Sequence, residues 1–324
     1  MKNTKRILAL LLSVLTMLTF AGCSNTQTGE KTLKIGLVKL VDHASLNEIN
    51  DSIKAEFASL GTKVEFIEKN ANGEPSTLPS IMQNLIGAGV DMIIPITTPA
   101  AQAAAAATST IPIVFAAVST PIEAGLTSSI EAPDKNVTGV SDAVPVGDIF
   151  KLASVLTPDV KTFGMFYNSG EVNSVATVKL AKDYCDENNI SYKESTISAT
   201  ADIQQAATVL AEDVDAIFIP TDNMVASAMP TFISVTNGAK IPVYAGADSL
   251  VKDGAFATVG INYTLLGQQV AQMADKILKG EKTIAETPIE VMKEYANMVN
   301  MAEAKLLGIE IPDDVKANLT VLVD

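Results

Sequence analysis

The sequence predicts an α/β protein made of two similar lobes, each a parallel β-sheet with helices on both faces. Short apolar runs of strand length alternate with segments of helical periodicity from residue 33 onward. One strand–turn–helix pattern occurs twice, first as "VDMIIPITTP" from Val90 and again as "VDAIFIPTDN" from Val214. The 324 residues are too many for one small core and sufficient for two domains. We therefore expect two doubly wound lobes joined by a three-strand hinge.

The elements of the first lobe follow in order along the chain. The segments "LKIGLVKL" at 33–40 and "KVEFIEK" at 63–69 have the composition of strands. Apolar residues at helical spacing over 78–86 predict an amphipathic helix. The apolar run at 91–96 predicts a buried strand, and an alanine-rich helix leads from it to a further strand at 111–118. This is the βαβ rhythm of a parallel sheet.

The second lobe repeats this order and is entered by the first of three crossings. The segment "KTFGMFYNSG" at 161–170 is its first strand. We expect the chain to cross into this lobe at 136–145, to return at 256–262, and to cross again within 288–300. The amphipathic helix at 264–280 is then expected to pack on the first lobe.

The N-terminus has the layout of a secretory signal. Lys2, Lys5 and Arg6 precede an apolar run at 7–20 that is too short to span a membrane comfortably. Small residues then stand directly before Cys23, and this stretch resembles a bacterial lipobox, in which cleavage exposes a cysteine that becomes diacylated. The alternative is an ordinary signal peptide with an incidental cysteine.

These observations give a complete domain plan. It consists of a signal peptide at 1–22, a tether at 23–32, lobe one at 33–142 plus 262–288, and lobe two at 143–261 plus 289–324. The expected location is the extracytoplasmic face of the cell membrane, with contact to the membrane only through the lipid on Cys23.

Composition excludes several function classes. Loss of residues 1–22, which hold three basic residues and no acidic one, changes the net charge from −14 to −17, and so the sequence argues against nucleic-acid binding. One histidine and the remaining Cys185, expected to be a small core residue, are too few for a zinc site. The sequence has no G-x-G-x-x-G after its first strand and no G-x-S-x-G elbow, and so we expect no cofactor and no serine hydrolase.

Polar residues follow the carboxyl ends of the predicted strands, where open parallel sheets bind ligands. The candidate ligand-binding residues are Asp42, His43, Thr97, Thr98, Ser119, Tyr167, Asn168, Glu171, Asn173, Ser174, Asp222, Asn223 and Asp248. Asn70, Asn72, Thr120, Ser169, Thr221 and Ser249 are further polar residues at strand ends.

The Thr97–Thr98 pair suggests a site for an anion. Thr98 is expected to cap the alanine-rich helix, with Pro99 at the first helical position, and the free N–H groups there favour a carboxylate. Simple capping without a ligand is the alternative. The opposite end of an amino acid is an ammonium, for which Asp222 is the preferred partner and Glu171 and Asp248 are alternatives.

Several of these segments also carry a family resemblance. They are "TTPAAQAAAAAT", "IPIVFAAVSTPIEAGL", "NVTGVSD", "FYNSGEVNSV", "IFIPTDNMVASAM" and "ATVGINYTLLGQQ". The chain resembles type I periplasmic-binding-protein-like receptors and, more narrowly, the ABC-transporter substrate-binding lipoproteins that include tryptophan- and tyrosine-binding members. It departs from them at Asp42–Ser45, where "DHAS" stands in place of a frequent Glu-His-Pro.

The resemblance implies a non-catalytic receptor that closes on its ligand and delivers it to an ABC permease with its ATPase. An aromatic amino acid as the ligand rests on the resemblance alone, whereas the charged groups at the strand ends suggest an amino acid of any kind. Two alternatives stay open: a receptor for a sugar or nucleoside on the same fold, and an anchored enzyme that uses carboxylates.

Overall fold

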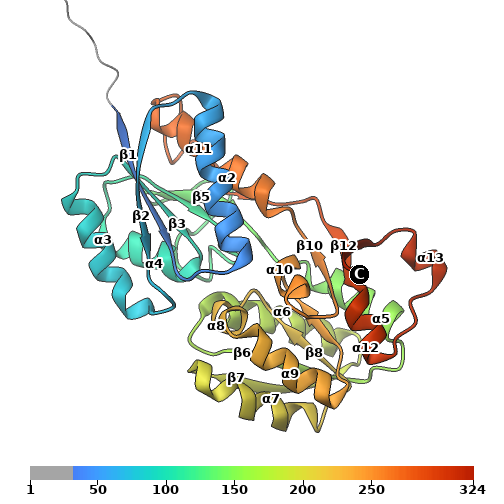
Figure 1. Cartoon of the computed structure of the whole chain (residues 1–324). Coiled ribbons are helices and arrows are strands. Elements are labelled where there is room, and N and C mark those ends of the chain that lie inside the picture. Colours follow the sequence, from blue (N-terminus) through green and yellow to red (C-terminus); the bar gives the residue numbers. More distant parts are fainter. Residues whose placement is uncertain (1–31) are drawn as a thin grey trace, which may run out of the picture. The chain divides into compact units, whose positions relative to one another are not determined.

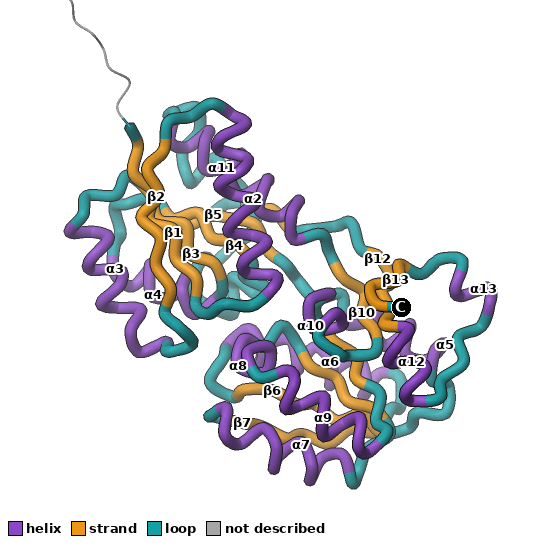
Figure 2. The backbone as a smooth tube through the Cα atoms, in the orientation of Figure 1, coloured by secondary structure: helices purple, strands orange, loops and turns teal. Residues whose placement is uncertain are grey.

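The computed structural model describes residues 32–324. The predicted signal peptide and the predicted lipidation site at Cys23 lie outside the described residues. The described chain forms two β-sheets, each with helices on both faces (Figures 1 and 2). This arrangement confirms the predicted fold class.

The first sheet has six parallel strands in the order β11-β5-β4-β3-β1-β2. Its strands are β1 (Leu33–Lys39), β2 (Val64–Asn70), β3 (Met92–Ile96), β4 (Ile113–Ala116), β5 (Val137–Ser141) and β11 (Glu290–Val291). The central strands β3, β4 and β5 are buried at every residue, as strands covered on both faces must be.

Two helices cover each face of this sheet. They are α2 (Ala44–Leu60) and α11 (Tyr263–Leu278) on one face, and α3 (Leu78–Gly87) and α4 (Thr98–Ala107) on the other, with the short η1 (Pro75–Thr77) before α3. The late helix α11 lies beside the early helix α2, as its amphipathic pattern predicts (Figure 1). Helix α4 turns three buried alanines toward the sheet, and these small side chains let it pack close to the strands.

The second sheet has seven strands in the order β13-β12-β10-β9-β8-β6-β7. They are β6 (Thr162–Asn168), β7 (Ser191–Ile197), β8 (Ala216–Ile219), β9 (Val243–Ala245), β10 (Ala257–Gly260), β12 (Ala296–Asn300) and β13 (Thr320–Val323). Strand β12 is antiparallel to β10, because the chain reaches it directly from the other lobe without a crossover helix.

The helices of the second lobe repeat the order of the first. They are α5 (Val146–Leu156), α6 (Val172–Glu187), η2 (Thr200–Asp202), α7 (Ile203–Ala211), α8 (Asn223–Ser227), α9 (Met229–Ala239), α10 (Asp248–Lys252), α12 (Met301–Leu307) and α13 (Asp313–Lys316). Cys185 on α6 is fully buried, in agreement with its predicted place in the core, and burial raises its pKa to about 12.

Three segments join the lobes, and one of them moves a predicted boundary. The chain crosses after β5, before α11, and between β11 and β12. Lobe two was expected to resume at residue 289, but Glu290 and Val291 pair with Val140 and Ser141 of the first sheet. The first sheet therefore gains an edge strand, because this segment pairs with β5 before it crosses.

Candidate functional site

A cavity lies between the loops that follow the carboxyl ends of the strands in both lobes. The first lobe contributes His43, Ser45, Leu46, Thr97, Thr98, Ala117, Ser119, Asp142 and Tyr263. The second contributes Asn173, Thr221, Asp222, Asn223, Ala226, Ala247, Ser249 and Leu250.

Thr97 is held in a strained backbone conformation at this cavity. Helix α4 begins at Thr98, so Thr97 and not Thr98 is the residue that precedes the helix, one position earlier than predicted. Thr97 has φ 93° and ψ 157°, a region that non-glycine residues rarely adopt. Its N–H donates to the Ala116 carbonyl at 3.0 Å, while its hydroxyl is buried and has no hydrogen-bond partner among residues 32–324. Thr97 thus combines a strained backbone with an unused hydrogen-bonding group at the cavity.

Asp142, at the end of β5, is a buried carboxylate that lines the cavity. It accepts hydrogen bonds from the Ser119 hydroxyl at 2.9 Å and from the Tyr263 hydroxyl at 3.4 Å. Burial raises the pKa of this carboxyl. None of the ion pairs found in residues 32–324 involves it, and so a negative charge at this position lacks a cation.

Asp222 also lines the cavity, but both of its oxygens are engaged within its own lobe. One accepts from the N–H of Val225, at 2.9 Å, and caps helix α8. The other accepts from the N–H of Asn168 and from the hydroxyl of Ser174, each at 2.7 Å. Asp222 thus holds three elements of lobe two together, which leaves it less available to an ammonium than the sequence suggested.

Glu171 lies behind Asp222 and is not among the residues that line the cavity. It accepts from the N–H groups of Asn223 and Met224, both at 3.1 Å, and from the Asn223 side chain at 2.6 Å. Burial, together with the nearby charge of Asp222, raises the pKa of Glu171 to about 7. Its role in the structure is to orient Asn223 and the start of α8.

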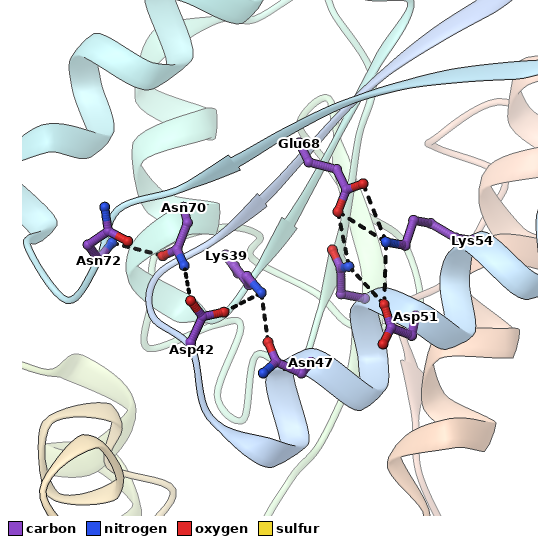
Figure 3. A network of polar contacts seen from close by, with 9 residues as sticks. Lys39, Asp42, Asn47, Asp51, Lys54, Glu68, Asn70 and Asn72 are labelled. Carbon is purple, nitrogen blue, oxygen red and sulfur yellow. Dashed lines mark hydrogen bonds and ion pairs between the residues drawn. The ribbon is translucent and has the colours of Figure 1, made fainter.

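His43 enters the cavity at the start of α2, while its neighbour Asp42 does not. Asp42 is exposed and is paired with Lys39 at 2.5 Å, and it accepts a hydrogen bond from Asn70 at 2.8 Å. Lys39 also donates to Asn47 on α2 (Figure 3). This network fixes the loop between β1 and α2 that carries His43. The Nδ1 atom of His43 is buried without a partner among the described residues.

The other predicted residues divide into two groups. Asn173 lines the cavity, and its side-chain oxygen is buried without a partner in the described part of the chain. Asn168 and Ser174 do not line the cavity and are hydrogen-bond partners of Asp222. Tyr167 donates to Glu194 at 2.8 Å, and Asp248 is paired with Lys252 at 2.6 Å. Neither lines the cavity.

Two hydroxyl pairs join the lobes across the cavity. Ser45 donates to Ser249 at 2.6 Å, and the hydroxyls of Ser119 and Thr221 lie 3.1 Å apart. Because the Ser119 proton is directed to Asp142, Thr221 must act as the donor in the second pair.

Asp142 and Tyr263 are among the cavity residues that escaped prediction from the sequence. Asp142 ends a strand as the other candidates do, but the segment around it was interpreted only as a crossing. Tyr263 lies in the segment after β10, and nothing in the local pattern indicates that it reaches Asp142. Among residues 32–324 there is no cluster of side chains suited to a metal ion, and no helix has the length and apolar character needed to cross a bilayer.

A family model described as ABC transporter substrate binding protein matches residues 34–321. The chain belongs to this family. It is therefore a substrate-binding protein, which confirms the expectation of a receptor and not an enzyme.

Individual relatives of this substrate-binding protein are similar over nearly its whole length. It is 34% identical to the tyrosine-binding protein of Clostridioides difficile, over 96% of this chain and 94% of that protein. It is 35% identical to a Streptococcus pneumoniae ABC domain solved in complex with L-Trp, with a TM-score of 0.87, over 90% of this chain and 99% of that one. The ligand-free, open structure of a substrate binding protein with adhesive properties from Clostridium difficile has the same identity and coverage, with a TM-score of 0.70.

Proposed function

We propose that this substrate-binding protein captures a free aromatic amino acid in the cavity between its lobes and presents it to an ABC permease with its ATPase. The lobes close on the ligand through the three crossing segments, and delivery follows when they open. The ligand is bound as a zwitterion, with its two charged groups held by different residues of the cavity wall.

The observation that carries this proposal is the buried carboxylate of Asp142 without a cation. An uncompensated buried charge is costly, and a ligand ammonium placed against it would remove that cost. The unpaired side-chain oxygen of Asn173 offers a second acceptor for the same ammonium. Asp142 therefore replaces Asp222 as the preferred ammonium partner.

The carboxylate of the ligand fits the start of α4. The first turn of this ten-residue helix presents free N–H groups, and the Thr97 hydroxyl beside it lacks a partner. Strands β3 and β5, which carry Thr97 and Asp142, are separated by β4 alone. The two strands are therefore two spacings of about 4.8 Å apart, a separation that suits the ammonium and the carboxylate of one amino acid.

The choice of an aromatic side chain rests on two supports. The relatives include a tyrosine-binding protein and a domain that binds L-Trp. In this chain, the cavity also has an apolar lining formed by Leu46, Ala226, Ala247 and Leu250. These alanines and leucines offer apolar contact to an aromatic ring.

Calorimetry on purified protein tests the ligand class. We expect tyrosine, tryptophan or phenylalanine to bind, and ribose, glucose and adenosine not to bind. A hundredfold excess of ligand over Kd should stabilise the fold by about 2.7 kcal/mol. Binding of a sugar or nucleoside without any response to amino acids would favour the alternative receptor.

We further propose that Cys23 is lipidated and holds the protein at the extracytoplasmic face of the membrane. Its support is the N-terminal sequence alone. Replacement Cys23→Ser should move the protein from the membrane fraction to the soluble fraction. Retention of an unmodified Cys23→Ser protein in the membrane fraction would contradict the lipid anchor.

A further inference from the structure

His43 stands apart from the charged end of the cavity. In the first sheet, the order β5-β4-β3-β1 separates the strand before Asp142 from the strand that leads into the His43 loop by three positions, about 14 Å at normal strand spacing. A hydrogen bond of about 3 Å at each end leaves about 8 Å for a ligand between them. One amino acid with an aromatic ring spans that distance, with its ring toward His43.

The surroundings of His43 match the far end of such a ligand. Leu46 follows His43 in the first turn of α2. Ser45, between them, donates to Ser249 at 2.6 Å, which brings helix α10 and its Leu250 to this side of the cavity. Two of the apolar lining residues, Leu46 and Leu250, thus lie on the His43 side of the cavity.

The hydrogen bonds around His43 indicate which nitrogen carries its proton. The amide N–H₂ of Asn223 donates to Glu171 at 2.6 Å, so Asn223 turns its amide nitrogen toward the carboxylate. The Asn223 side chain, which also lines the cavity, favours the protonated form of the imidazole, as an amide oxygen that faces an N–H group does. Since Nδ1 has no partner among the described residues, Nε2 is the nitrogen assigned to face Asn223 and to carry the proton.

Burial lowers the pKa of His43 to about 4, and the charge of Lys39 acts in the same direction. The imidazole is therefore neutral at pH 7 and carries one proton, on Nε2. Its Nδ1 is left as a buried acceptor. A ligand group that meets it must be a donor.

We propose that His43 Nδ1 accepts a hydrogen bond from the polar atom of the ligand ring, the hydroxyl of tyrosine or the indole N–H of tryptophan. His43 is thus a specificity-determining residue that separates these amino acids from phenylalanine. This inference rests on the proposed function, because it requires an aromatic amino acid in the cavity.

Matched ligand pairs measured by calorimetry test it: tyrosine against phenylalanine, and tryptophan against 1-methyltryptophan, which lacks the N–H. We expect the wild-type protein to prefer the donor-bearing member of each pair by about tenfold to a hundredfold. His43→Leu should reduce both preferences to less than about threefold. His43→Gln, which retains an acceptor oxygen, should restore part of them. Thermal unfolding of both variants verifies that the lobes remain folded.

The outcomes separate this inference from the proposed function. Equal binding of tyrosine and phenylalanine by the wild type would overturn the role of His43. So would a His43→Leu protein that binds both more weakly but keeps their ratio. Absence of binding by all four amino acids would instead overturn the proposed function, and the role of His43 with it.

Discussion

The two walls of the cavity differ in how their polar groups are used. On the first lobe, Thr97 and His43 each present a buried atom without a partner among residues 32–324, and Asp142 has no cation among them. On the second lobe, Asp222 and Glu171 are engaged by hydrogen bonds from their own lobe. The first wall retains most of the bonding capacity for a ligand, whereas the second is a preformed network apart from the side-chain oxygen of Asn173. Substitutions on the first wall should affect binding, and those on the second should affect stability.

The largest effect is expected for Asp142→Asn. Loss of the charge that faces the ligand ammonium should weaken amino-acid binding by about 2–4 kcal/mol, or about thirtyfold to a thousandfold. The stability of the ligand-free protein should not fall, because burial of this uncompensated charge is unfavourable. Calorimetry and thermal unfolding measure the two effects, with Asp148→Asn on the exposed face of α5 as the matched control.

The same residue predicts a pH dependence of binding. The pKa of Asp142 is raised above its ordinary value of 3.8 in the ligand-free protein. As the pH falls through this raised pKa, the carboxyl takes up a proton and its attraction for the ammonium is lost. Affinity should therefore decline as the pH falls through this raised pKa in the wild type and vary less in Asp142→Asn.

Asp222→Ala tests the opposite wall. Removal of this carboxylate leaves the buried N–H groups of Asn168 and Val225 unpaired, and the free energy of unfolding should fall by about 3 kcal/mol. Urea unfolding measures the change. The exposed Asp183 of α6, paired with Lys179, supplies the control, since Asp183→Ala should cost less than about 0.5 kcal/mol. Wild-type stability in Asp222→Ala, with binding alone impaired, would reverse the assignment of the two walls.

Glu171→Gln should change how stability depends on pH. The pKa of Glu171 is raised from 4.5 to about 7 in the folded protein. Its contribution to stability is therefore complete below pH 4.5 and is lost as the pH rises to about 7. Over that range the wild type should lose about 2–3 kcal/mol relative to the variant. If the free energy of unfolding varied with pH in the same way for both proteins, the charge on Glu171 would not destabilise the hydrogen-bond network of lobe two.

The smallest effect concerns the hydroxyl bridge between Ser45 and Ser249. Each serine-to-alanine change should weaken ligand affinity only about twofold to tenfold, because a neutral hydrogen bond contributes about 0.5–1.5 kcal/mol. The double variant should be little worse than either single one, with a coupling free energy of up to about 1 kcal/mol. If the affinity losses of the two single variants simply added in the double variant, the two serines would not be hydrogen-bonded to each other in the ligand-bound state.

The sequence alone determined the two-lobe fold, because hydrophobic periodicity and strand–helix alternation are local properties. The repeat at Val90 and Val214, the return of α11 to the first lobe and the burial of Cys185 could all be derived from neighbouring residues. So could most of the strand ends that line the cavity. The polar residues at these strand ends could be named as candidates because parallel sheets bind ligands at that edge.

Only the tertiary structure decided which polar residues keep a free atom. Asp142 and Asp222 are both acids at strand ends, and nothing local distinguishes them. Asp222 is saturated by Asn168 and Ser174, about fifty residues away in the chain, while Asp142 receives its Tyr263 contact from a segment 121 residues later. Hydrogen-bond capacity is consumed by partners that folding brings together from distant parts of the chain, and so the sequence can name the candidates, but only the folded structure shows which of them remain for a ligand.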